Sequence, residues 1–275
     1  MTIKEALVLG DVQNRHENLW LLEKITGLTS TQLRLENEYF TLSPEAVRQY
    51  LDMLEQRRRH VPLQYILEDW DFMGLPMKCR PGVLIPRNDT EVLASEAIDF
   101  LHRLLDNEAH PRVLDLCTGS GCIGVALAYF CSSAYITMTD INPDALKLSQ
   151  ENATLNGVND RITFVQANLF EGINDSFSCI TANPPYIPTA EIASLPEEVK
   201  KEPILALDGG IDGLRFYRNI ISESMKHLQP GGGIFLEIGN TQKEAVEELL
   251  YNHGFKNVKT IKDIENRDRV VRALI

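Results

Sequence analysis

From residue 90 onward, short apolar runs alternate with amphipathic stretches, and this alternation constrains the fold more than any other feature of the chain. An apolar run followed by a helical stretch is typical of a β-strand and the helix that leads to the next parallel strand. The pattern therefore predicts an α/β fold, a doubly wound and mostly parallel sheet. We expect its parallel strands at residues 112–117, 134–140, 162–167, 177–182 and 233–238.

Two late runs and the first 89 residues complete the predicted organisation. Residues 258–264 and 269–275 are β-rich and close in sequence, so we expect an antiparallel pair at the edge of the sheet. Residues 1–62 predict helices only; Ser43 and Pro44, for example, form a helix start that apolar residues follow at helical spacing. Residues 63–89 hold prolines and glycines between short apolar stretches, which favours a β-hairpin linker. The α/β domain is expected to span 90–275.

Composition narrows the class of protein. The formal net charge of −12 over 275 residues argues against broad binding to nucleic-acid backbones. The chain has neither a long apolar span nor a secretory signal pattern at Met1–Gly10, so we expect a cytoplasmic protein. Its five cysteines show no metal-ligand spacing, and we interpret them as reduced thiols with no bound metal: Cys79, Cys117, Cys122, Cys131 and Cys179.

A glycine-rich loop follows the first predicted strand. Its sequence, Asp115-Leu-Cys-Thr-Gly-Ser-Gly-Cys-Ile-Gly124, contains G-x-G-x-x-G, and Asp140 at the end of the next strand is placed to hold ribose hydroxyls. The same features fit a nicotinamide dehydrogenase. Asp115 favours a different ligand, because a carboxylate at the mouth of the loop repels a pyrophosphate but attracts an ammonium group. S-adenosylmethionine carries that ammonium group and no phosphate, and Asn168 after the third strand is placed to pair with its adenine.

The tetrapeptide Asn183-Pro184-Pro185-Tyr186 follows the fourth strand and indicates the chemistry. An amide or aromatic amine is a poor nucleophile because its lone pair is delocalised, so a methyltransferase must orient the NH₂ group. The Asn183 side-chain oxygen and the Pro184 carbonyl can each accept one of its N–H bonds. The two prolines make the corner rigid, and Tyr186 offers a flat face to a planar group.

These motifs, in this order, resemble the family of release-factor glutamine N5-methyltransferases, the HemK/PrmC family, over nearly the whole chain. Further matching segments are Pro62-Leu-Gln-Tyr-Ile, Leu84-Ile-Pro-Arg-Asn-Asp-Thr-Glu91, Glu202-Pro-Ile-Leu-Ala-Leu, Gly210-Ile-Asp-Gly-Leu and Pro230-Gly-Gly. The resemblance implies a helical N-terminal domain that binds the partner, a β-hairpin linker and a seven-stranded methyltransferase domain. It also implies the substrate, the glutamine of the Gly-Gly-Gln motif in class I peptide-chain release factors.

The chain departs from the family at two positions. Cys117 stands where the family commonly has glycine, and Asn88 where proline is usual. We expect cofactor binding to survive, on the assumption that Cys117 has negative backbone angles. Arg87, Thr90 and Glu91 resemble the family's linker signature, although Thr90 and Glu91 also make an ordinary helix start.

We therefore predict transfer of a methyl group from S-adenosylmethionine to a release-factor glutamine, with Asn183 and Pro184 as the catalytic pair and with Pro185 and Tyr186 completing the substrate site. The expected cofactor residues are Asp115, Cys117, Thr118, Gly119, Ser120, Gly121, Asp140, Asn168 and Asn183. An N6-adenine methyltransferase acting on nucleic acid is the main alternative, because adenine also presents a planar NH₂; a dehydrogenase and a non-catalytic binding factor follow. The basic run Arg57–Arg59 is either a solvated helix end or a contact to an acidic partner or RNA.

Overall fold

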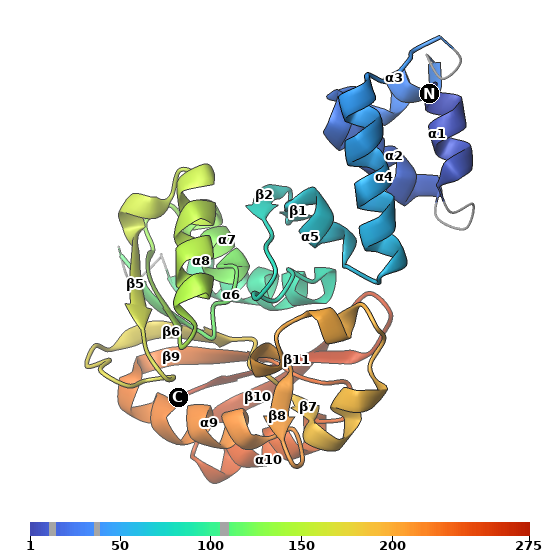
Figure 1. Ribbon diagram of the computed structural model, residues 1–275. Helices are drawn as coiled ribbons and strands as arrows, with labels where there is room; N and C mark the ends of the chain where they lie inside the picture. Colours follow the sequence, from blue (N-terminus) through green and yellow to red (C-terminus); the bar gives the residue numbers. More distant parts are fainter. Residues whose placement is uncertain (11–14, 36–38, 105–109) are drawn as a thin grey trace. The chain divides into compact units, whose positions relative to one another are not determined.

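The computed structural model describes residues 1–275 except 11–14, 36–38 and 105–109. Contacts divide the chain into two compact units (Figure 1). The smaller unit comprises Met1–Asp69 and Glu197–Lys201, and the larger one comprises Trp70–Pro196 and Glu202–Ile275. The short segment 197–201 thus belongs with the N-terminal residues although it follows the Asn-Pro-Pro-Tyr corner in sequence. The division at residues 62 and 89 that the sequence suggested remains a prediction.

The smaller unit is helical, as expected. Its helices are α1 (Ile3–Leu9), α2 (Arg15–Thr26), α3 (Ser30–Leu35), α4 (Pro44–Arg58) and α5 (Leu63–Leu67). The predicted start of α4 is confirmed, because the Ser43 hydroxyl accepts a hydrogen bond from the Ala46 backbone N–H at 3.1 Å and Pro44 occupies the first turn. Leu21, Leu22 and Tyr50 are fully buried in the core of this unit.

The basic run at the end of α4 is engaged within the same unit. Arg57 contacts Glu17 at 2.9 Å and Glu198 at 2.8 Å, and its side chain is only 16% exposed. Arg58 and Arg59 are exposed and each pair with Glu55 on the preceding turn. Arg57 is therefore a partly buried link between α2, α4 and segment 197–201, while its two neighbours form a solvated helix end.

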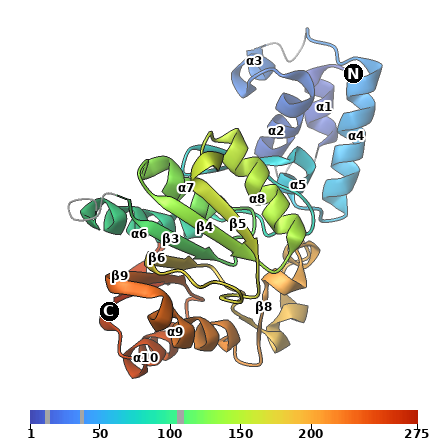
Figure 2. The ribbon, with the colours of Figure 1, turned by 90° about the vertical axis from the view of Figure 1, so that its left-hand side faces the viewer.

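The larger unit is built on one seven-stranded sheet in the order β10-β11-β9-β6-β3-β4-β5 (Figure 2). The strands are β3 (Arg112–Leu116), β4 (Tyr135–Asp140), β5 (Ile162–Gln166), β6 (Phe177–Ala182), β9 (Leu228–Glu237), β10 (Lys256–Lys262) and β11 (Asp268–Leu274). β3, β4, β5, β6 and β9 are parallel, whereas β10 pairs antiparallel with β11 and β11 with β9. The fold class is confirmed, and β9 begins five residues earlier than predicted.

Helices cover both faces of the sheet (Figure 2). They are α6 (Glu91–Leu104), α7 (Cys122–Phe130), α8 (Pro143–Leu155), α9 (Arg215–His227) and α10 (Lys243–Asn252). Successive strand residues alternate between two cores: Val113 packs with α6 and α7, and Leu114 with α9 and α10. Because both faces are covered, β6 is buried along its whole length and β3 from its second residue onward.

Short elements lie between these strands and helices. The predicted hairpin is present as a two-stranded sheet of β1 (Asp69–Phe72) and β2 (Leu75–Lys78), and β7 (Ile187–Pro188) pairs with β8 (Asp208–Gly210). After β3 the chain adds β4 and β5 on one side, and it then returns to place β6 on the other side of β3. Ligands of such sheets bind at this switch point, at the carboxyl ends of the strands.

Candidate active site

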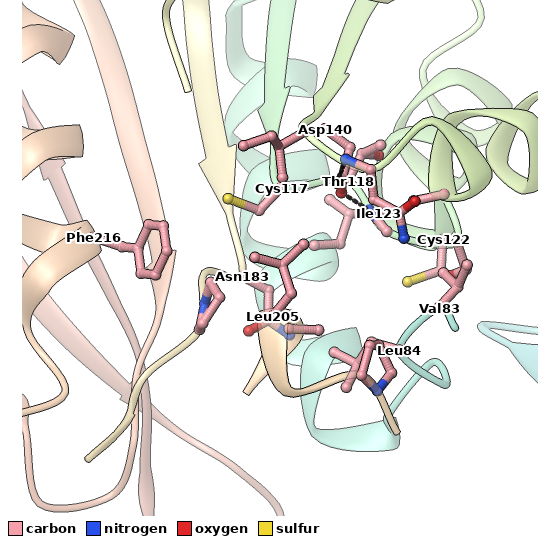
Figure 3. A pocket seen from close by; sticks show the side chains of 18 of the residues that line it. Val83, Leu84, Cys117, Thr118, Cys122, Ile123, Asp140, Asn183, Leu205 and Phe216 are labelled. Atoms are coloured by element: carbon pink, nitrogen blue, oxygen red, sulfur yellow. Dashed lines mark hydrogen bonds between the residues drawn. The ribbon is translucent and has the colours of Figure 1, made fainter. Parts of the chain in front are cut away.

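A cavity of about 340 Å³ opens at the switch point, within the range of small-molecule sites (Figure 3). It lies wholly in the larger unit. Eight of the predicted site residues line it: Cys117, Thr118, Gly119, Ser120, Asp140, Asn168, Asn183 and Pro185. Asp115, Gly121, Pro184 and Tyr186 are not among its lining residues. Most, but not all, of the residues predicted from the sequence therefore line the same cavity.

The glycine loop is shaped by its neighbours. Gly119 and Gly121 have φ of +57° and +81°, the left-handed region that glycine tolerates. A Cβ on Gly121 would lie 2.6 Å from the Ser149 Cβ on α8, so α7 can begin this close to α8 only with glycine there. The loop backbone is held toward the cavity by Asp140, whose Oδ2 accepts a hydrogen bond from the Gly119 N–H at 2.9 Å (Figure 3).

The prediction for the backbone of Cys117 was wrong. Its φ is +55°, so a residue with a Cβ occupies the left-handed region, where the side chain crowds the carbonyl oxygen. This is the position at which the resembling family commonly has glycine. The Cys117 side chain lines the cavity, and burial raises the pKa of its thiol above the ordinary value, so the group is neutral.

The sequence predicted that Asp115 attracts the ammonium group of the ligand, but in the structure its carboxylate is engaged by two hydroxyl groups. Its side chain is fully buried, and its two oxygens accept hydrogen bonds from the hydroxyls of Thr118 at 2.5 Å and Thr181 at 2.8 Å. Burial raises its pKa to about 6. Asp115 therefore orients the cavity-lining Thr118, and direct contact with a ligand stays a prediction.

The Asn-Pro-Pro-Tyr corner connects the cavity to its surroundings. The Asn183 Nδ2 donates a hydrogen bond to the Thr90 hydroxyl at 3.1 Å, and Thr90 is buried with only 2% exposure. The Tyr186 carbonyl accepts a hydrogen bond from the Gln242 side chain at 2.9 Å. Tyr186 itself lines a second, more open cavity beside Arg87, Glu237 and other charged residues. Its predicted stacking on the substrate stays a prediction.

Sequence reasoning missed much of the cavity wall. The linker segment 82–87 forms one side, held in place by the buried Glu202 carboxylate, which accepts a hydrogen bond from the Ile85 N–H at 3.0 Å and pairs with Arg87. The Phe216 ring on α9 lies on the far side of the cavity from Leu84, and Leu205 lies between Asn183 and Leu84 (Figure 3). In the sequence, the segments that begin at Leu84 and Glu202 stood out only as matches to the family. No contact between them and no place for them in the cavity was predicted.

The geometry fits S-adenosylmethionine better than a dinucleotide. The cradle of left-handed glycines, the acid at the end of β4 and Asn168 beyond β5 can accommodate a nucleoside and an amino-acid tail. The buried Asp115 places negative charge under the loop, where a pyrophosphate would be repelled. In the part of the chain that the structure describes, no group of three or more metal-ligating side chains is placed to hold an ion, and no helix is long and apolar enough to cross a membrane.

Comparisons with known proteins cover both units. Residues 88–197 match the family model described as "Methyltransferase small domain", and residues 9–67 match "PrmC N-terminal domain". A "Release factor glutamine methyltransferase" from Clostridium acetobutylicum is 37% identical over 100% of this chain and 99% of its own length. A protein of the same name from Moorella thermoacetica is 40% identical over 99% of this chain and 98% of its own length. A crystal structure of a methyltransferase from Pyrococcus furiosus, 18% identical, covers 74% of this chain and 90% of its own with a TM-score of 0.50, a likeness in fold alone.

Proposed function

The chain belongs to the family of release factor glutamine methyltransferases, and from this membership and its cavity we propose how its own residues methylate the glutamine side chain of a release factor. The observation that carries the proposal is the orientation of Asn183. Its Nδ2 is engaged by Thr90, so its Oδ1 is left to accept a hydrogen bond in the cavity. A primary amide donates two N–H bonds and fits that oxygen.

The cofactor, S-adenosylmethionine, supplies when bound a methyl group already activated on a sulfonium sulfur. Asp140 and the loop from Cys117 to Ser120, which line the cavity, would hold its nucleoside and amino-acid ends, and Asn168 would contact the adenine. No metal or covalent nucleophile is required for this step, and the protein's task is to orient the amide.

Asn183 and Pro184 perform that orientation. The Asn183 Oδ1 accepts one amide hydrogen and the Pro184 carbonyl accepts the other, which turns the nitrogen lone pair toward the methyl carbon. Both acceptors also stabilise the positive charge that grows on the nitrogen during transfer. The prolines fix the corner, and the nitrogen loses its extra proton to water afterwards.

The helical N-terminal unit is the part that docks the release factor in this proposal. Its support is that residues 9–67 match the PrmC N-terminal domain model, ahead of the methyltransferase match at residues 88–197. The formal net charge of −12 disfavours the alternative substrate, a nucleic acid adenine.

The test compares Asn183→Ala with Asn168→Ala. Asn183→Ala should reduce kcat for release-factor methylation by at least about 10²-fold, because one transition-state acceptor is lost. Its cofactor Kd, measured by calorimetry, should change little. Asn168→Ala should instead raise the cofactor Kd. Full turnover in Asn183→Ala would remove the amide-orienting role.

A further inference from the structure

A buried glutamate lies behind the catalytic asparagine. Glu237 is the last residue of β9 and is only 1% exposed. In the sheet, Leu236 pairs with Ala182 of the neighbouring strand β6, so Glu237 at the end of β9 and Asn183 just after β6 both follow this pair directly. Glu237 was not among the predicted site residues, because it stands at the end of an apolar run.

The side chains around Glu237 form a polar cluster, and Glu237 also lines the second cavity beside Arg87 and Asp89. The Asn183 Nδ2 donates a hydrogen bond to the Thr90 hydroxyl at 3.1 Å, and Thr90 and Asn183 both act on the Glu237 carboxyl group by lowering its pKa against the effect of burial. Among the described residues, the Glu237 Oε2 is buried and has no hydrogen-bond partner within bonding distance. A buried acceptor left without a donor is costly, so this oxygen favours any arrangement that turns an N–H toward it.

The Asn183 amide has a donor end and an acceptor end, so its neighbours can determine which end faces the cavity. The Asn183 side chain can present either its oxygen or its NH₂ to the cavity, and the two states have nearly the same shape. An ionised carboxylate only accepts hydrogen bonds, so it stabilises the state in which the NH₂ faces Glu237 and Thr90. The opposite state would place the asparagine oxygen against a negative charge and would meet the substrate NH₂ with another donor.

We propose that Glu237 is a positioning residue, which acts with Thr90 to hold the Asn183 amide so that its oxygen, and not its nitrogen, faces the substrate amide. This inference rests on the proposed function. It adds the group that makes Asn183 present an acceptor, and not a donor, to the substrate amide. The charge behind Asn183 also strengthens its oxygen as an acceptor through the chain of hydrogen bonds.

The proposal has a consequence for pH dependence. Burial raises the pKa of Glu237 to about 7, in spite of hydrogen bonding from Thr90 and Asn183 and the nearby charge of Arg269, and Asp89 raises it further. Tyr186, Tyr217 and Cys122 also face this region, and burial raises the pKa of each, so they remain neutral. Once protonated, Glu237 donates an O–H, and the orientation of Asn183 is no longer enforced. Turnover should therefore fall as the pH decreases through about 7.

The experiment uses the full chain and replaces Glu237 with its neutral isostere. Glu237→Gln should lower kcat for release-factor methylation by about 10²-fold, the scale of a misplaced catalytic contact, with the cofactor Kd unchanged. The decline of kcat below pH 7 should disappear, because the titrating group is gone. Glu247→Gln is the matched control: Glu247 is half-buried on α10 and accepts a hydrogen bond from Thr260, away from the cavity, so its kcat and pH profile should stay at the wild-type values.

A second variant separates positioning from folding. Thr90→Val removes the hydroxyl at constant shape, and the double variant with Glu237→Gln should be about as slow as the slower single variant, because both act on one amide. Wild-type kcat in Glu237→Gln would overturn the inference, and so would multiplicative losses in the double variant or a parallel loss of cofactor affinity. If Asn183→Ala is inactive while Glu237→Gln is fully active, only this inference fails. If Asn183→Ala is active, the proposed function of Asn183 fails first.

Discussion

Replacing Gly121 with alanine tests whether the glycine loop is set by contact with α8. The new Cβ would lie 2.6 Å from the Ser149 Cβ and 3.0 Å from its Cα, at a φ of +81°. Gly157 offers a matched control, because its φ is +69° and a Cβ there meets nothing within 4 Å. Gly157→Ala should therefore cost only the left-handed backbone, about 1–2 kcal/mol of unfolding free energy.

Gly121→Ala adds the clash, which overpacking data put at about 1–3 kcal/mol, for a total of about 2–5 kcal/mol. Denaturant unfolding followed by circular dichroism measures both variants, and calorimetry measures their cofactor affinity. Only Gly121→Ala should weaken cofactor binding, because Gly119 and Ser120 beside it line the cavity. Equal losses of stability in the two variants would refute the contact with α8 as the reason for glycine.

Three further predictions concern the loop, its buried acid and the basic run. Cys117→Gly relieves a φ of +55° and should raise the Tm by a few degrees in differential scanning fluorimetry, whereas a lower Tm would show that the thiol packing outweighs the strain. Burial raises the folded-state pKa of Asp115 from 3.8 to about 6, so its contribution to the unfolding free energy should decrease as the pH rises from 3.8 to 6 and level off above that. Asp115→Asn should flatten this part of the profile of unfolding free energy against pH. An unchanged profile would contradict the shift. Arg57→Ala should lower the unfolding free energy by about 1 kcal/mol because it removes the two ion pairs with Glu17 and Glu198, while the exposed Arg59→Ala should have little effect on the same measurement.

The strands were predictable because their signal is local. Each buried parallel strand reads as an apolar run, and the predicted and observed ends of β3, β4, β5 and β6 agree within a residue or so. β9 starts earlier because residues 228–232, which include Pro230 and two glycines, already belong to the strand. The small β7–β8 sheet could not be predicted, because strands of two and three residues carry no periodicity.

The site was only partly predictable, for a different reason. The residues that follow strands in sequence are brought to one edge by the topology of the sheet, so Gly119, Asp140 and Asn183 could be grouped in advance. Burial of Asp115 depends on Thr181, which is 66 positions away, and the cluster of Thr90, Asn183 and Glu237 joins three distant segments. Such partners are visible only once the chain is folded.

The most direct test of the account is transfer of labelled methyl from S-adenosylmethionine to a class I release factor, to its Gly-Gly-Gln variant with alanine in place of glutamine, and to DNA. The account predicts label on the wild-type release factor alone, located by mass spectrometry on the side-chain nitrogen of that glutamine. Label on the alanine variant or on DNA would contradict it, since the Asn183 corner would then be orienting some other group.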